Sequence, residues 1–176
     1  MSNKNLPKWK NIHTIVFDFD GVFTDNKVYI NEKGEESVCC DRSDGLAIEL
    51  IRKLSKEKNW PLELCILTRE ENKVVFKRAQ KLKIKYYGGI KQKILILKKI
   101  VDFKDSGEDG LIYLGNDIND LECMKFAGFS VAPIDAHITV LNIADMVIKE
   151  KGGNGFVRKF IELLLHDQDL NRLINY

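Results

Sequence analysis

Short apolar runs alternate with amphipathic stretches along most of the chain. An apolar run that is too short for a helix and is bounded by polar or turn residues indicates a buried strand. Apolar residues that recur every three or four positions indicate a helix with one buried face. The predicted strands are at residues 13–19, 62–67, 84–87, 110–114, 129–131 and 146–148, and the predicted helices at residues 46–58, 72–82, 92–101, 119–126 and 155–165. This alternation predicts an α/β fold, a single Rossmann-like domain whose parallel sheet is sandwiched by helices.

A β-hairpin interrupts the alternation early in the chain. Residues 28–30 and 36–40 have strand-like composition and flank residues 31–34 (NEKG), a sequence typical of a turn. The helix after the hairpin has Ser43 or Asp44 as its expected N-cap. We find no internal repeat or long linker, so we expect one domain over residues 1–176, with the polar residues 1–10 as a flexible N-terminus.

Polar side chains follow three of the predicted strands where each strand ends. Asp18 and Asp20 end the first strand, Thr68 ends the second, and residues 116–120 (NDIND) follow the strand that ends at Leu114. In parallel sheets, ligands bind outside the carboxyl ends of the strands. The sequence therefore predicts that these side chains converge at one edge, as an active site requires.

The carboxylates of Asp18 and Asp20 can reach one site if the chain turns sharply after the strand, which Gly21 permits. Like charges this close repel each other, so a cation is their natural neutraliser. Oxygen ligands favour a hard ion such as Mg²⁺, and Asn116 and Asp117 would supply further oxygens from the neighbouring strand end. Which of these two completes the metal site stays open at this point.

This arrangement suits the hydrolysis of a phosphate monoester. Asp18 would attack phosphorus and form an aspartyl phosphate, because the metal and Lys93 cancel the repulsion between carboxylate and phosphate. Asp20 would protonate the leaving alcohol and then accept a proton from the attacking water. Thr68 would donate a hydrogen bond to a phosphoryl oxygen.

Each of these residues taken alone has a simpler interpretation. Asp18 and Asp20 could belong to a turn, and Thr68 could cap the next helix. Lys93 alone would be a surface lysine, and Asn116 with Asp117 alone a turn. Their order and spacing together favour the active-site interpretation.

Composition and charge exclude several other classes of function. Hydrophobic residues make up 44% of the 176 residues, and 28 basic against 26 acidic residues leave a net charge near +2. This balance gives no reason to expect nucleic acid or an acidic membrane as a partner. The N-terminus has no signal-peptide pattern, and no apolar run approaches the ~20 residues of a membrane span. The four cysteines include no CxxC pair, so we expect free thiols and a cytoplasmic protein.

At this point the sequence resembles the haloacid dehalogenase-like phosphatase superfamily. Residues 18–25 (DFDGVFTD) look like its first motif, with the nucleophile first and the acid/base second. Thr68 and Lys93 look like its second and third motifs. Residues 115–120 (GNDIND) look like the fourth, which completes the metal site.

The resemblance extends over nearly the whole chain, to a small branch without a cap domain. The hairpin, residues 42–45 (RSDG) and residues 151–158 (KGGNGFVR) are similar to that branch. It includes 3-deoxy-D-manno-octulosonate 8-phosphate phosphatases, phosphatases of nine-carbon keto-sugar acids, and the phosphatase-like domain of acylneuraminate cytidylyltransferases. The resemblance implies a homotetramer in which the hairpin helps form the assembly and neighbouring subunits close each active site.

Two departures concern the metal and the substrate. The family usually has Asp where Asn116 stands; an amide oxygen can bind Mg²⁺ but carries no charge. The octulosonate enzymes usually have Gly-Arg after the second-motif Thr, whereas Arg69 and Glu70 follow Thr68 here. Glu70 and Lys81 match a Glu–Lys pair of the nine-carbon keto-acid phosphatases, which favours a sialic-acid-like 9-phosphate, although both could equally be exposed helix charges.

Arg158 follows a glycine-rich loop and could reach a substrate carboxylate by bidentate contact, or could lie on the surface of the last helix. We therefore predict Mg²⁺-dependent hydrolysis of a phosphorylated keto-sugar acid, either a sialic-acid-like 9-phosphate or 3-deoxy-D-manno-octulosonate 8-phosphate. The alternative is a catalytically weak assembly or regulatory module associated with an acylneuraminate cytidylyltransferase.

Overall fold

The computed structural model describes residues 4–102 and 104–173. Within this part, six parallel strands form one sheet in the order β5-β4-β1-β6-β7-β8. These strands are β1 Thr14–Phe17, β4 Glu63–Leu67, β5 Lys85–Tyr87, β6 Leu111–Leu114, β7 Phe129–Pro133 and β8 Met146–Ile148. The predicted single α/β domain with a parallel sheet is confirmed, and no cap domain is inserted among the described residues.

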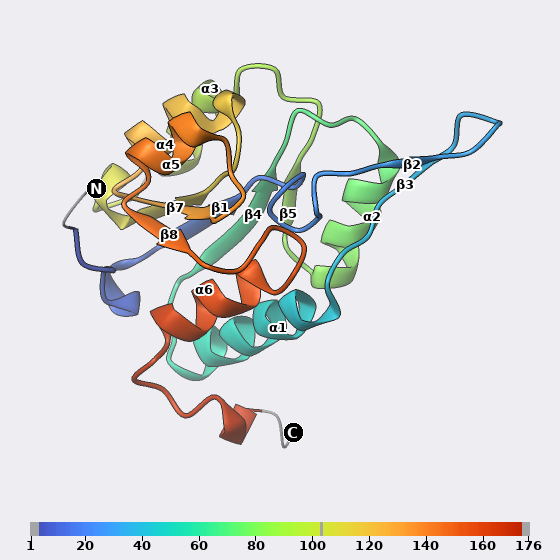
Figure 1. Cartoon of the computed structure of the whole chain (residues 1–176). Coiled ribbons are helices and arrows are strands. Elements are labelled where there is room, and N and C mark those ends of the chain that lie inside the picture. Colours follow the sequence, from blue (N-terminus) through green and yellow to red (C-terminus); the bar gives the residue numbers. More distant parts are fainter. Residues whose placement is uncertain (1–3, 103, 174–176) are drawn as a thin grey trace.

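Helices cover both faces of the sheet (Figure 1). The helices are α1 Arg42–Glu57, α2 Lys73–Leu82, α3 Lys93–Val101, α4 Leu121–Phe126, α5 Ile138–Ile143 and α6 Phe156–Leu164. Single 3-10 turns occupy Trp9–Asn11, Gly107–Gly110, Ile118–Asp120 and Asn171–Leu173. Helices α1, α2 and α6 pack on one face, and α3, α4 and α5 pack on the other.

The central strand shows why the sheet has two cores. Successive side chains of a strand point to opposite faces, so a strand buried on both sides is apolar at every position. Ile15 and Phe17 pack with α1 and α6, whereas Val16 between them packs with the α3–α4 side. All four residues of β1 are buried, which fits the continuous apolar run in the sequence.

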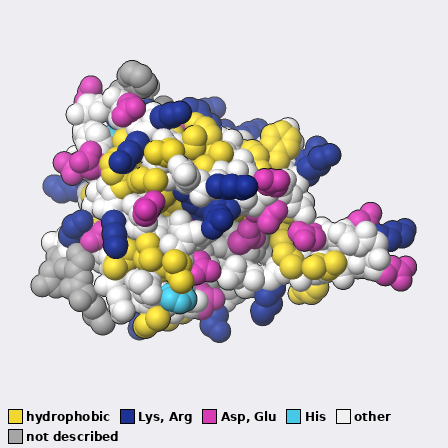
Figure 2. All heavy atoms as spheres, turned by 90° about the horizontal axis from the view of Figure 1, so that it is seen from above, with side chains coloured by type: hydrophobic (Ala, Val, Ile, Leu, Met, Phe, Trp, Pro, Cys, Tyr) yellow, Lys and Arg dark blue, Asp and Glu magenta, His cyan; other side chains and the backbone are white. Residues whose placement is uncertain are grey.

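The hairpin consists of β2 Tyr29–Ile30 and β3 Glu36–Ser37, and it projects away from the body of the molecule (Figure 1). Its turn is closed by Asn31, whose Oδ1 accepts hydrogen bonds from the N–H groups of Lys33 and Glu35 at 3.0 Å each. Yellow hydrophobic side chains lie along the hairpin where it leaves the body in Figure 2. Val28, Tyr29 and Ile30 are 50%, 62% and 63% exposed.

One local expectation was wrong, and two further local features were not predicted. Helix α1 begins at Arg42 and is capped by Asp41, whose carboxylate accepts the N–H of Ser43 at 2.7 Å; neither Ser43 nor Asp44 is the cap. Helix α5 was not predicted. At the N-terminus, residues 1–3 lie outside the described residues. Trp9 is 6% exposed and its ring lies 5.0 Å from that of Trp60, so the chain is packed against the body at this residue. Among the described residues, no helix has both the length and the apolarity that crossing a membrane requires.

Candidate active site

The carboxyl ends of β1, β4 and β6 bring the predicted residues together. These strands are neighbours, and Phe17 pairs in register with Ile66 on one side and Leu114 on the other. A cleft of about 190 Å³ opens at this edge. It is lined by Asp18, Asp20, Asn26, Thr68, Arg69, Glu70, Asn116, Asp117 and Asn119.

A buried chain of charges lies at the base of this cleft. Lys93, the first residue of α3, is 3% exposed, and its Nζ lies 2.8 Å from an oxygen of Asp18 and 2.8 Å from an oxygen of Asp120. Burial works against the charged form of Lys93, but the two carboxylates outweigh it and raise the pKa of its ammonium group. Lys93 is therefore a cation fixed against Asp18, and the surface-lysine interpretation is excluded.

Asp18 and Asp120 share a single buried cation, Lys93, which does not balance the charge of both carboxylates. Burial and the charge of Asp120 raise the pKa of Asp18 to about 8, and the ion pair with Lys93 offsets this only in part. A second cation beside Asp18 would favour its ionised form, because an opposite charge within a few ångströms lowers a carboxyl pKa. The site therefore has the electrostatic character of one that takes up a cation.

Asp120 anchors these charged contacts; the sequence placed it at this edge of the sheet but assigned it no catalytic or metal-binding role. Its side chain is fully buried; one oxygen accepts the Tyr113 hydroxyl at 2.8 Å, and the other accepts the N–H of Asn116 at 3.0 Å and of Asp117 at 3.3 Å. The available signal was its spacing, since Asp117 and Asp120 form a capping box around the Ile118–Asp120 turn. Asp120 thus positions both Lys93 and the backbone of the fourth motif.

Asp20 stands on the turn after β1. Burial and the charge of Glu70 raise the pKa of Asp20, which favours the protonated form that a general acid needs. Gly21 makes this turn with a φ of +76°, and a Cβ at Gly21 would lie 2.0 Å from Nδ2 of Asn116. Glycine is therefore required both by the backbone conformation and by the close approach of Asn116.

Asn116 fits a cation ligand better than Asp117 does. Asn116 is 6% exposed, and its Oδ1 is buried without a hydrogen-bond partner in the described part of the chain. Asp117 is exposed, and its carboxylate accepts the N–H of Ile118 at 2.7 Å. Within the described residues, no three His, Cys, Asp or Glu side chains gather as a metal site, although Asp117 lines the same cleft as Asp18 and Asp20. Asp18, Asp20 and Asn116 are the residues that could hold a cation.

Thr68 and Glu70 follow β4 and face the same cleft. Oγ1 of Thr68 accepts the N–H of Glu70 at 3.0 Å, which leaves the hydroxyl hydrogen available for a ligand. Thr68 does not cap α2; that role belongs to Asn72, whose Oδ1 accepts the N–H of Val74. An oxygen of Glu70 accepts the N–H groups of Glu71 and Asn72 at 2.8 Å each, so the start of α2 fixes its carboxylate.

Two predicted substrate contacts lie elsewhere in the chain. Lys81 is exposed in the last turn of α2, ~12 Å along the helix axis from its first residue, whereas Glu70 precedes that first turn. The guanidinium group of Arg158 pairs with Glu162 one helical turn later. The backbone N–H of Arg158 donates to Oδ1 of Asp44 at 2.8 Å. Neither lines the cleft, so the structure does not bring Lys81 to Glu70 or Arg158 to the catalytic carboxylates.

The glycine-rich loop before Arg158 supports the first motif. A Cβ at Gly152 would lie 2.0 Å from the carbonyl oxygen of Gly21, and the N–H of Gly153 donates to Val22 at 3.1 Å. These glycines allow two backbone segments to touch. Their role in this structure is to back the turn that carries Asp20.

Comparisons with known proteins agree with this geometry. A model of the haloacid dehalogenase-like hydrolases matches residues 10–160. The Escherichia coli K12 3-deoxy-D-manno-octulosonate 8-phosphate phosphatase KdsC is 31% identical over 161 residues, which are 91% of this chain and 82% of that protein. A Yersinia pestis structure of 3-deoxy-D-manno-octulosonate 8-phosphate phosphatase has a TM-score of 0.83 at 30% identity. The match covers 93% of this chain and 86% of the Yersinia chain. A Moraxella catarrhalis structure of that name, in complex with magnesium, phosphate and KDO, has a TM-score of 0.84 at 26% identity, covering 94% and 93%.

A parallel α/β sheet with Asp18, the buried Lys93 and Asp120 in contact at its carboxyl edge has the architecture of a hydrolase of the haloacid dehalogenase type. The chain belongs to the haloacid dehalogenase-like hydrolase family. Within that family it is a phosphatase, in agreement with the reaction class expected from its motifs.

Proposed function

We propose that the chain hydrolyses the phosphate ester of a keto-sugar acid with the help of Mg²⁺. The observation that carries this proposal is the pair of buried ion pairs that Lys93 makes with Asp18 and Asp120, beside Asp20 at the carboxyl edge of the sheet. The similarity to KdsC phosphatases supports 3-deoxy-D-manno-octulosonate 8-phosphate as a substrate. Glu70 lines the cleft and matches a Glu of the nine-carbon keto-acid phosphatases. A sialic-acid-like 9-phosphate is therefore the other candidate substrate.

The reaction proceeds in two steps on Asp18. Its carboxylate attacks phosphorus, the bond from phosphorus to the sugar oxygen breaks, and Asp20 gives that oxygen its proton. Water then attacks the aspartyl phosphate while Asp20 takes the proton, which releases phosphate and restores Asp18. Lys93 and the Thr68 hydroxyl hold the phosphoryl oxygens through both steps.

Asp18, Asp20 and the amide oxygen of Asn116 would hold the magnesium ion. When bound, Mg²⁺ supplies positive charge that offsets the repulsion between the Asp18 carboxylate and the phosphate dianion. The buried, unpartnered Oδ1 of Asn116 supports this assignment, because a buried acceptor without a partner is costly unless something binds it. Asp117, whose N–H donates to Asp120 at 3.3 Å, would contribute by holding the turn beside Asn116 and as a further oxygen near the ion.

The assembly is a homotetramer in this proposal, with a hairpin that contributes to contacts between copies. The exposed apolar side chains of Val28, Tyr29 and Ile30 support it, since such patches mark protein interfaces. Lys81, which is remote from its own cleft, would contact substrate in the cleft of a neighbouring copy. A cytidylyltransferase is the other protein partner expected. The cytoplasmic location stays a prediction from the free cysteines.

Phosphate release from a panel of 8-phosphate and 9-phosphate keto-sugar acids, with and without Mg²⁺, tests the proposal. We expect turnover by the wild type and a loss of at least about 10³-fold in Asp18→Asn, which removes the nucleophile. Asp105→Asn removes the same charge from an exposed loop outside the cleft, and serves as the matched control. Folded, assembled protein without turnover of any phosphorylated sugar acid would favour the regulatory-module alternative, and full activity of Asp18→Asn would refute the mechanism.

A further inference from the structure

A second chamber of about 200 Å³ adjoins the catalytic cleft. The two cavities share Asp20, Asn26 and Glu70, so they meet at the predicted general acid. A general acid must lie within hydrogen-bond reach of the oxygen that it protonates. The carbon chain attached to that oxygen therefore extends past Asp20, and the second chamber is the space that adjoins it there.

The lining of the second chamber selects for a particular chemistry. Its apolar walls are Phe19, Val28, Val38, Val74 and Val75, and its polar groups are Asp20, Asn26, Glu36, Glu70 and Asn72. No Lys or Arg is among these described lining residues. Carboxylates accept hydrogen bonds from hydroxyl groups but repel another carboxylate. The chamber therefore suits an uncharged, hydroxyl-bearing carbon chain and disfavours an acid group near the phosphate.

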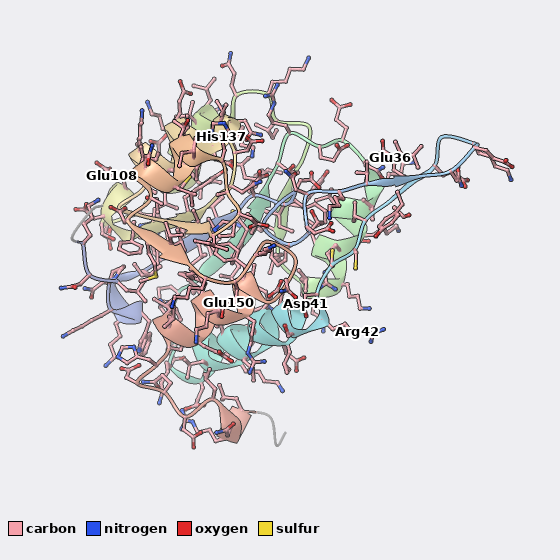
Figure 3. All side chains as sticks on the ribbon, in the orientation of Figure 1. Glu36, Asp41, Arg42, Glu108, His137 and Glu150 are labelled. Atoms are coloured by element: carbon pink, nitrogen blue, oxygen red, sulfur yellow. The ribbon has the colours of Figure 1, made fainter. Side chains whose placement is uncertain are left out.

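Glu36 is the carboxylate that the hairpin contributes to this chamber. It lies on β3 where the hairpin passes the start of α2 (Figure 3). Its Oε2 accepts a hydrogen bond from Nδ2 of Asn72 at 3.0 Å, while Oδ1 of Asn72 caps α2 through the N–H of Val74. The helix start thus fixes the position of Glu36. Its Oε1 has no hydrogen-bond partner in the described part of the chain and is available to a ligand.

We propose that the second chamber binds the polyhydroxylated carbon chain next to the phosphoester, and that Glu36 is a specificity-determining residue there. Glu36 accepts hydrogen bonds from hydroxyl groups of the leaving group and repels a carboxylate held close to the phosphate. This inference rests on the proposed phosphatase function and adds an orientation to it. The phosphorylated end and its neighbouring hydroxyls occupy the chamber, and the acid end of a keto-sugar acid lies outside it.

The test measures kcat/KM of wild type and Glu36→Gln for two classes of substrate. This substitution keeps the size of the side chain and an oxygen that accepts the hydrogen bond from Asn72. The polyol class is represented by 3-deoxy-D-manno-octulosonate 8-phosphate and sorbitol 6-phosphate, and the acid class by 3-phosphoglycerate. We expect kcat/KM to fall by about tenfold for the polyol class, because hydrogen bonds to a charged acceptor are the stronger ones. We expect kcat/KM for 3-phosphoglycerate to rise by about threefold or more as the repulsion is removed. Glu49→Gln removes the same charge from the exposed face of α1, outside both cavities, and should alter neither value.

The opposite directions distinguish specificity from a structural effect. A change of the same sign and size for both classes would mean that Glu36 only supports the fold or the charge of Asp20, and would overturn the proposal, as would no change for either. Failure of the proposed substrate is recognised separately. In one outcome the wild type turns over sorbitol 6-phosphate but no keto-sugar acid phosphate, while Glu36→Gln still lowers kcat/KM for the polyol relative to 3-phosphoglycerate. That result would reject keto-sugar acids as the substrate class and retain the assignment of the second chamber. A wild type that turns over neither class would overturn both.

Discussion

The side chain of Asn116 occupies a position where a single atom decides how tightly the site binds its cation. Its Oδ1 is buried without a partner, and Gly21 leaves room for its amide group. A ligand amide offers one neutral oxygen, whereas a carboxylate adds a full negative charge to the same position. The number of charged ligands is one of the features that tunes the affinity of a protein site for a hard cation.

We therefore predict that Asn116→Asp lowers the Mg²⁺ concentration for half-maximal activity by about tenfold. Without Mg²⁺ the same variant should be less stable, because a further carboxylate then lies near Asp18 and Asp20; a loss of ~1 kcal/mol corresponds to a Tm lower by about 2–4 °C. Magnesium titrations of activity and of Tm measure both effects.

The exposed Asp117 provides the discriminating comparison. Asp117→Asn removes a charge from the neighbouring residue while an amide can still cap the Ile118–Asp120 turn. If Asp117 were the ligand, this variant would raise the Mg²⁺ requirement and Asn116→Asp would leave it unaltered. That pattern would reverse the assignment made here.

At the residue scale, the sequence predicted which residues meet at the edge of the sheet better than it predicted how each side chain is oriented there. Asp18, Asp20, Thr68 and Asn116 each follow a strand, and parallel strands bring such residues to one edge. The sequence placed Asp120 at this edge but predicted no role for it. Which acid of NDIND turns inward depends on the 3-10 turn at Ile118–Asp120, and periodicity does not show a turn of three residues.

At the scale of elements, Asp44 ties α1 to α6. It lies in the first turn of α1, fully buried, and its Oδ1 accepts the N–H of Arg158 at 2.8 Å near the start of α6. Its Oδ2 has no hydrogen-bond partner in the part of the chain that the structure describes. Burial raises the pKa of Asp44 from 3.8 to about 6, although the N–H of Arg158 works in the opposite direction.

This raised pKa predicts how stability depends on pH. The folded protein holds the Asp44 proton more tightly than the unfolded chain, so the stabilisation is fully present below pH 4 and is lost as the pH rises through about 6. Between pH 5 and pH 8, Asp44→Asn should therefore gain stability relative to the wild type, by about 1–3 kcal/mol. Urea unfolding at several pH values measures this difference, and Glu49→Gln on the exposed face of α1 is the charge-matched control. A wild-type-minus-variant difference that is constant with pH would contradict the prediction.

The boundaries of helices and strands were predicted less accurately than their existence. The strands and long helices were predicted from runs and periodicity within a few residues of their observed ends. Helix α5, Ile138–Ile143, has only six residues, too few to establish a helical period. Helix α1 starts four residues earlier than predicted because Asp41 caps it, while the polar residues after Asp41 resemble a loop in the sequence.

At the scale of the whole molecule, one copy of the chain leaves two features unexplained. The hairpin leaves Val28, Tyr29 and Ile30 at least half exposed among the described residues. Lys81 is at the far end of α2 from its own cleft, although the resemblance paired it with Glu70. Assembly would account for both, because a neighbouring copy could cover the hairpin and bring its Lys81 to this cleft.

Mixed assemblies test whether Lys81 acts in a neighbouring copy. We predict that Asp18→Asn and Lys81→Ala chains, each poorly active on the keto-sugar acid phosphate alone, regain activity when coexpressed and purified together through two different tags. In a random mixture, a site needs an intact Asp18 from one copy and an intact Lys81 from another, which gives about a quarter of the wild-type activity. Asp18→Asn mixed with Asp20→Asn should regain nothing, because both carboxylates must come from the same chain in one cleft. A mixture no more active than its parts would confine Lys81 to the surface of its own helix.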